Sequence, residues 1–145
     1  DAKGLDRETV ETFVARATLE QPGIAYTYTR SQLERGDVPA HRIGLLVQRA
    51  WHRQMAVDVV VVPKPFHYFQ SKSTSSPNAC SHGTPYTYDT NVPLLLQGSR
   101  WVRPGRYFEY AETVDVAPTL AYVLNVRTPS GSEGKVLGQA LVSQR

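Results

Sequence analysis

The stretch "VDVVVVPKP", residues 57–65, decides the fold class. A continuous run of β-branched residues bounded by prolines predicts a strand that is buried on both of its faces. The stretch "VPLLLQG", residues 92–98, predicts a second buried strand, which stops at its glycine. Alternating residues in "GIAYTYTR" (23–30) predict a strand with one buried side, and "GRYFEY" (105–110) predicts an edge strand.

Helical patterns separate these strands. Asp6 is the expected N-cap of a first helix, which ends before Pro22. The stretch "RSQLERGD" (30–37) predicts a short helix or turn closed by Gly36, and a further helix is expected to begin near Pro39. The expected buried stripe of the first helix is Val10, Phe13, Val14 and Ala17, and that of the helix after Pro39 is Ile43, Leu46, Val47, Ala50 and Trp51.

The last predicted helix begins at Asp115 as its N-cap, with Pro118 in its first turn. A glycine-rich turn with a short apolar tail follows at 127–141. Together the elements predict an α/β fold, with a mixed, largely parallel sheet and helices on both of its faces. The expected buried face of the last helix is Val116, Leu120, Val123 and Leu124.

Length and composition are those of one globular domain, residues 1–145. The chain carries 16 basic and 13 acidic residues, a net charge of +3 without a run of like charges. Arg100, Arg103 and Arg106 cluster beside Trp101, and we interpret them as an exposed rim rather than a nucleic-acid patch. No apolar stretch reaches the roughly 18 residues needed for a membrane span. Because no initiator methionine or signal segment precedes Asp1, we expect a processed form or a piece of a longer protein.

The stretch "SHGTPYTYDTNVP", residues 81–93, holds the candidate site. His82 lies in a flexible loop expected at the edge of the sheet, where Gly83 lets the backbone approach a ligand closely. A neutral imidazole there can bind zinc through one nitrogen. Asp89 could accept a hydrogen bond from that imidazole or bind the backbone of its own turn, and the turn role is favoured. One histidine does not make a zinc site.

Other candidate ligands are weak. His41, His52 and His67 show no partner spacing such as HxxxH. Cys80 is the single cysteine, so the chain forms no internal disulfide and its cysteine content leaves the compartment open. A thiolate beside His82 is a weak candidate for a ligand or nucleophile.

Two stretches resemble a known family: "HGTPYTYDTNVPLLLQG" (82–98) and "VDVAPTLAYVLNVRTPSGSEGKVLGQAL" (114–141). They are similar to the C-terminal end of bacterial alkaline phosphatases of the type I phosphodiesterase/nucleotide pyrophosphatase-like group, within the alkaline phosphatase superfamily. That family has His-Gly-Ser/Thr-x-Tyr-x-Tyr-Asp-x-x-Val-Pro, an Asp-x-Ala-Pro-Thr-Leu helix and Pro-x-Gly-x-x-Gly. The segments around 23–33 and 57–69 also look like the family, so the resemblance covers nearly the whole chain. It implies a C-terminal fragment of a larger catalytic domain.

The resemblance implies that His82 is the last protein ligand of a centre with two zinc ions. The implied substrate is a phosphate ester, the implied partner is the N-terminal portion of the same protein, and the implied location is periplasmic or secreted. His67 matches no ligand of the family pattern. The residues implied to support the ligand loop are Gly83, Thr84, Tyr86, Tyr88 and Asp89.

Family chemistry implies hydrolysis of phosphate monoesters through a covalent phospho-enzyme. The threonine or serine nucleophile and the Asp-His metal motifs belong to parts that this chain does not contain, so we expect the 145 residues alone to be inactive. Two alternatives stay open. One is a phosphodiesterase, phosphonate hydrolase or phosphomutase of the same superfamily, and the other is a non-catalytic binding or assembly module.

Overall fold

The computed structural model describes residues 4–54, 57–69 and 81–142. Its contacts divide the chain into two compact units, Asp1–Val92 and Pro93–Arg145. That both belong to one domain stays a prediction.

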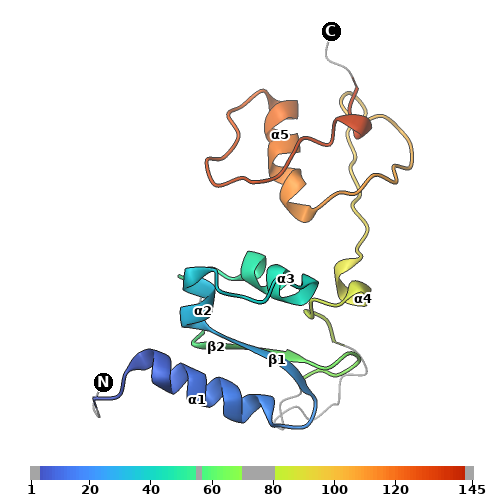
Figure 1. Ribbon diagram of the computed structural model, residues 1–145. Coiled ribbons are helices and arrows are strands. Elements are labelled where there is room, and N and C mark those ends of the chain that lie inside the picture. Colours follow the sequence, from blue (N-terminus) through green and yellow to red (C-terminus); the bar gives the residue numbers. More distant parts are fainter. Residues whose placement is uncertain (1–3, 55–56, 70–80, 143–145) are drawn as a thin grey trace, which may run out of the picture. The chain divides into compact units, whose positions relative to one another are not determined.

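The first unit is built on a two-stranded antiparallel sheet (Figure 1). Strand β1 (Ile24–Thr29) pairs with β2 (Val59–Pro63), so that Thr29 lies opposite Val59 and Ile24 opposite Pro63. The strand expected from the valine run is therefore confirmed, but its burial on both faces is not, since Val59, Val60 and Val61 are half-buried. The largely parallel sheet is not found in the part of the chain that the structure describes.

The start of β2 lies beside the end of β1. Two helices, α2 (Arg30–Arg35) and α3 (Arg42–Ala50), lie between the two strands in the sequence. The Arg30 N–H donates to the Asp58 carbonyl at 2.8 Å, which places the start of β2 beside the end of β1. The chain then runs back along β1, and the pair is antiparallel.

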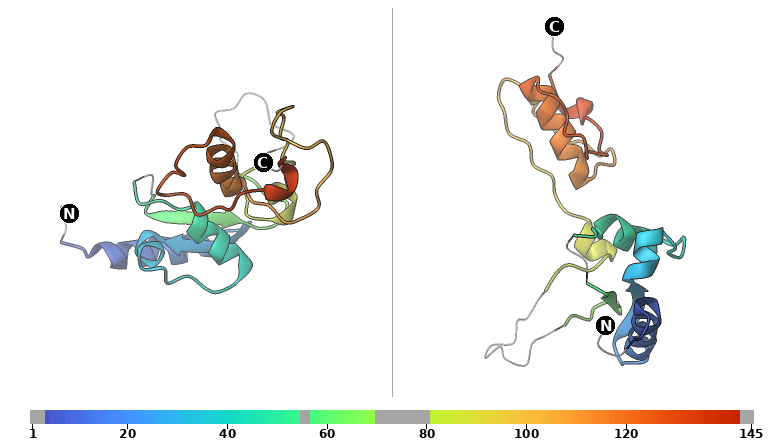
Figure 2. Two further views of the ribbon diagram at one scale, coloured as in Figure 1. Left: turned by 90° about the horizontal axis from the view of Figure 1, so that it is seen from above. Right: turned by 90° about the vertical axis from the view of Figure 1, so that its left-hand side faces the viewer.

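Helices cover both faces of this pair of strands (Figures 1 and 2). Helix α1 (Arg7–Leu19) packs against one face, and α2 and α3 lie over the other. Asp6 is the N-cap of α1, as predicted, and accepts a hydrogen bond from the Thr9 N–H at 3.0 Å. Gly36 closes α2 at a φ of 70°, also as predicted, because glycine tolerates this left-handed conformation.

A small core fills the space between the sheet and the helices α2 and α3. It consists of Tyr28, Leu33, Val47 and Val62. The predicted face of α3 is confirmed in part, since Val47 is buried, Ile43, Leu46 and Trp51 are half-buried, and Ala50 is exposed. Helix α3 begins at Arg42, three residues after Pro39, with His41 as its N-cap.

The predicted buried stripe of α1 is wrong. Val10, Phe13, Val14 and Ala17 are exposed, and 73% of the Phe13 surface is accessible. Glu11 and Ala15 face the rest of the unit instead.

The Glu11 carboxylate accounts for this rotation of α1. One oxygen accepts from Nε of Arg7 at 2.8 Å, and the other accepts from the Ser31 N–H in the first turn of α2 at 2.9 Å. These hydrogen bonds hold the polar side of the helix inward and leave its apolar side exposed.

In the second unit, neither predicted strand forms. Residues 92–98, which begin at the boundary between the units, and residues 105–110 are irregular, and Leu95 and Phe108 are about nine-tenths exposed. A strand requires a neighbour for its backbone hydrogen bonds. The described part of this unit offers only an isolated bridge between Val102 and Leu141.

Helix α5 (Val116–Leu124) forms, but with another buried face than predicted. Pro118, Thr119 and Ala121 are buried, while Leu120 and Leu124 are exposed and Val116 and Val123 are half-buried. The Thr119 hydroxyl explains the rotation: it donates to the Asp115 carbonyl at 2.6 Å and accepts from the Leu137 N–H at 3.0 Å.

Asp115 stands at the start of α5, as expected, but its carboxylate does not cap that helix. One oxygen accepts from the Glu112 N–H and the other from the Lys135 N–H, both at 2.9 Å. These contacts close the short 3₁₀ helix η1 (Thr113–Asp115) and connect it to the glycine-rich segment. A second 3₁₀ helix, η2 (Gly138–Ala140), lies at the end of that segment.

Replacement of Glu11 tests the contact that orients α1. Glu11→Ala should lower the free energy of unfolding by about 1–3 kcal/mol, because the partly buried Ser31 N–H loses its acceptor. Urea unfolding followed by circular dichroism measures the change. Glu20→Ala, which removes an exposed carboxylate at the end of the same helix, should change it by less than about 0.5 kcal/mol. Equal losses in the two variants would contradict this account.

Candidate functional site

The candidate site lies on the loop that precedes the short helix α4 (Thr87–Thr90). The Asp89 carboxylate accepts two hydrogen bonds from Thr84, from the hydroxyl at 2.6 Å and from the N–H at 2.8 Å. These bonds hold the pKa of Asp89 below its ordinary value, the hydroxyl contributing most. The contact is the turn role expected for Asp89, and a role beside a metal stays a prediction.

Gly83 allows the loop to turn at this point. Its φ is 105°, in the region that favours glycine. A Cβ built at Gly83 would meet no atom of the described structure within 4 Å. Within this unit, the positive φ of Gly83 requires a glycine, whereas close packing against another group does not.

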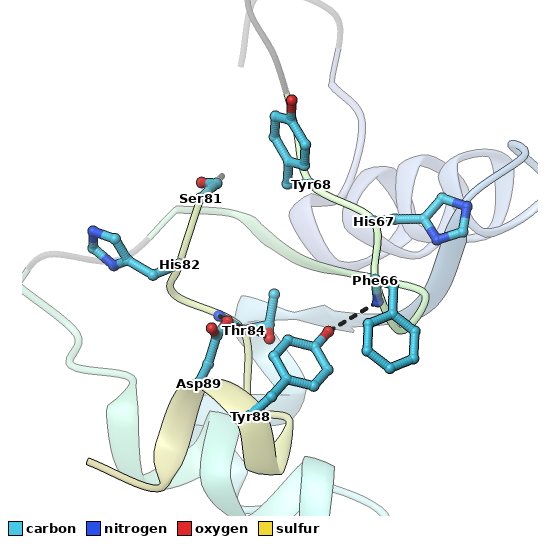
Figure 3. Close-up of a pocket in the computed structure, with 8 residues that line it drawn as sticks. All are labelled: Phe66, His67, Tyr68, Ser81, His82, Thr84, Tyr88 and Asp89. Atoms are coloured by element: carbon cyan, nitrogen blue, oxygen red, sulfur yellow. Dashed lines mark hydrogen bonds between the residues drawn. The ribbon is translucent and has the colours of Figure 1, made fainter. Parts of the chain in front are cut away.

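Two tyrosines attach the loop to the end of β2. The Tyr86 hydroxyl donates to the Pro63 carbonyl at 2.8 Å, and the Tyr88 hydroxyl accepts from the Phe66 N–H at 3.0 Å (Figure 3). The Tyr86 and Tyr88 rings stack with their centroids 5.6 Å apart. Burial raises the pKa of Tyr86 and keeps its hydroxyl protonated as a donor.

Arg42 attaches the loop to α3 from another direction. One guanidinium nitrogen donates to the Pro85 carbonyl and another donates to the Thr90 hydroxyl, each at 3.1 Å. The arginine therefore binds the segment just before α4 and the last residue of that helix. Sequence reasoning did not single out Arg42, because no local pattern links it to residues more than forty positions away.

The loop and the end of β2 enclose a pocket of about 300 Å³. His82 is exposed, and its ring points away from Asp89 and Tyr88 (Figure 3). His67 lies on the opposite side of the pocket, and its Nδ1 is 2.9 Å from the Pro65 carbonyl. The residues that line the pocket are Phe66, His67, Tyr68, Ser81, His82, Thr84, Tyr88 and Asp89.

The described residues do not make a zinc centre by themselves. Residues 4–54, 57–69 and 81–142 contain no group of three or more His, Cys, Asp or Glu side chains that could hold a metal ion. Zinc sites in proteins use three or four such ligands. Cys80, the weak thiolate candidate, lies outside the described residues. Two exposed imidazoles, those of His67 and His82, line the pocket of the described chain.

Other candidate residues have structural partners. His41 caps α3 by accepting from the Gly44 N–H at 3.2 Å, and His52 accepts from the Gln54 N–H at 3.3 Å. The Arg100 guanidinium lies 5.1 Å from the centre of the Trp101 ring. Arg103 donates to the Gln139 carbonyl. That the chain binds no nucleic acid stays a prediction.

Comparison with known proteins gives relatives along nearly the whole chain. The alkaline phosphatase PafA of Elizabethkingia meningoseptica is 22% identical over 138 residues, which is 94% of this chain and 24% of that protein. The alkaline phosphatase PhoV of Synechococcus elongatus is 40% identical over 55 residues, 37% of the chain and 10% of that protein. The chain is similar to these two proteins named alkaline phosphatase. No protein-family model matches it.

The fold is that of part of an alkaline phosphatase. The crystal structure of wild-type PafA superposes on the chain with a TM-score of 0.75 at 20% identity, covering 95% of this chain and 25% of that one. The chain thus spans about a quarter of the length of PafA. A protein named calcium-transporting ATPase, from Myroides odoratus, is 22% identical over 143 residues, 97% of this chain and 25% of that protein. Among the described residues, every helix is too short or too polar to cross a bilayer.

The Thr84 hydroxyl gives a test of the loop. Because the pKa of Asp89 is lowered in the folded chain, the turn contact is present above the ordinary carboxyl pKa of about 3.9 and is lost as the pH falls through the lowered value. Thr84→Val should raise the pKa of Asp89, because it removes the hydroxyl hydrogen bond that contributes most to lowering that pKa. An NMR titration of the Asp89 carboxyl carbon measures this pKa. Thr87→Val, on the exposed start of α4, is the matched control, and an unmoved pKa in Thr84→Val would refute the assignment.

Proposed function

We propose that this chain is part of a zinc-dependent phosphate monoester hydrolase that works through a covalent phospho-enzyme. In this proposal His82 supplies one zinc ligand of the full-length active site, which holds two zinc ions. The observation that carries the proposal is the match of 94% of the chain to a protein named alkaline phosphatase, PafA. We also propose a periplasmic or secreted location, on the family resemblance alone.

The role of this chain's residues is to hold and present the imidazole. Zinc, when bound, supplies a Lewis acid and lowers the pKa of a coordinated water. Thr84 and Asp89 close the turn after His82, while Tyr86 and Tyr88 fix the turn to β2. A ligand loop fixed in this way loses little conformational entropy when its imidazole binds, which favours affinity and a defined geometry.

The N-terminal portion of the same protein is the proposed partner. It would supply the remaining ligands and the nucleophile, because the chain spans only a quarter of its relatives. Exposed apolar side chains on α1 and α5 support this partner, since apolar groups at helical spacing are ordinarily covered. They include Val10, Phe13 and Val14 on α1, and Leu120 and Leu124 on α5.

Loss of the proposed ligand should abolish the activity of the full-length protein. His82→Ala is expected to reduce kcat/KM for p-nitrophenyl phosphate by at least about a hundredfold and to lower the bound zinc, because ligand loss weakens metal binding. Rates and metal content by mass spectrometry measure both effects. His52→Ala, an exposed histidine in the same unit, is the matched control and should retain activity. Normal zinc content and rate in His82→Ala would reject the proposed role of His82.

The 145-residue chain alone should show no zinc-dependent hydrolysis of p-nitrophenyl phosphate. One imidazole binds zinc too weakly, and with too little fixed geometry, to support turnover. The measurement compares the purified chain with and without added zinc, beside the full-length protein at equal concentration. Turnover that depends on zinc in the chain alone would contradict the proposed division of the site.

A further inference from the structure

We propose that Phe66 and Tyr88 form an aromatic wall that selects phosphate monoesters with a flat aromatic leaving group, such as aryl or nucleoside phosphates. This inference rests on the proposed phosphatase function and adds the class of substrate. It starts from the backbone of Phe66, the residue that follows β2 by three positions.

Phe66 has an unusual backbone conformation. Its φ is 63°, in the left-handed region that bulky side chains rarely adopt. Such conformations persist where the surroundings hold them, and they gather at ligand sites. Here the Phe66 N–H donates to the Tyr88 hydroxyl at 3.0 Å, so the loop that carries His82 also fixes Phe66 (Figure 3).

The side chains form a stacked pair. The Phe66 and Tyr88 rings lie with their centroids 5.0 Å apart and their planes 19° from parallel. Within the described structure 86% of the Phe66 surface and 47% of the Tyr88 surface are accessible, so the pair presents ring surface rather than filling a core. Exposed aromatic rings bind other flat rings by stacking.

The pair lines the same pocket as His82. Phe66 and His82 lie on opposite sides of it, with Thr84 between them in the view of Figure 3. Its volume of about 300 Å³ is within the range of small-molecule sites, about 300–1,000 Å³. The His82 ring itself points away from Tyr88 (Figure 3), so the inference requires the phosphate to lie on the pocket side of His82, with its leaving group toward the aromatic pair. A flat ring gains a stacking contact there, and an aliphatic group does not.

The test compares two substrates of the full-length protein, phenyl phosphate and glycerol 2-phosphate. Phe66→Leu should lower the ratio of their kcat/KM values about tenfold, the size expected from one lost stacking contact. Phe66→Tyr, which keeps the ring, should retain the wild-type ratio. Phe108→Leu removes an aromatic ring that is 92% exposed in the other unit and should also retain it. An unchanged ratio in Phe66→Leu, or an equal fall in Phe108→Leu, overturns the inference.

A second measurement separates this inference from the proposed function. The 145-residue chain is titrated by NMR with phenyl phosphate and, separately, with glycerol 2-phosphate. A shift of the Phe66 N–H with the aromatic compound only supports the wall, even if the full-length protein hydrolyses neither compound and the proposed function fails. Equal shifts, or none, overturn the wall whatever the activity.

Discussion

The antiparallel pairing of β1 with β2 is the constraint on which the first unit depends. It sets Thr29 opposite Val59 and directs β2 toward Pro63, where the sheet ends. The groups that receive the His82 loop are the Pro63 carbonyl and the Phe66 N–H, both at this end. A shift of register by one residue would turn every side chain of β2 to the other face and move these groups. The position of the candidate site is thus a consequence of strand register.

Local signals in the sequence predict the elements of this unit well. The cap at Asp6, the turn at Gly36 and the valine strand each depend on a few neighbouring residues. The rotation of α1 could not be predicted in this way, because it depends on a hydrogen bond between Glu11 and Ser31, twenty residues apart. Apolar spacing identifies which side of a helix is apolar, but not which side faces the rest of the unit. The buried face of α5 could not be predicted for the same reason, because the Thr119 hydroxyl accepts a hydrogen bond from the Leu137 N–H, eighteen residues away.

In the candidate site, too, local contacts could be predicted from the sequence, and contacts between distant residues could not. The sequence predicts that Asp89 binds the backbone of its own turn, and in the structure the Asp89 carboxylate accepts from the Thr84 N–H. Contacts across the chain left no signal: Arg42 binds Pro85 and Thr90, and the Tyr88 hydroxyl holds Phe66 in a left-handed conformation. A phenylalanine gives no indication of positive φ, since only glycine and asparagine adopt it readily.

Two features of the described chain lack groups that a further portion of the protein could supply. Its helices α1 and α5 expose apolar side chains, and the histidines that line its pocket, His67 and His82, are not joined among the described residues by a set of metal ligands. The turn of residues 84–90, by contrast, takes its hydrogen bonds to β2 and α3 from this chain. A docking portion that covers the apolar faces would need to add ligands, but would not need to order this turn. Because these contacts order the turn that follows His82 before any other portion docks, they would lower the entropy cost of assembling the proposed site.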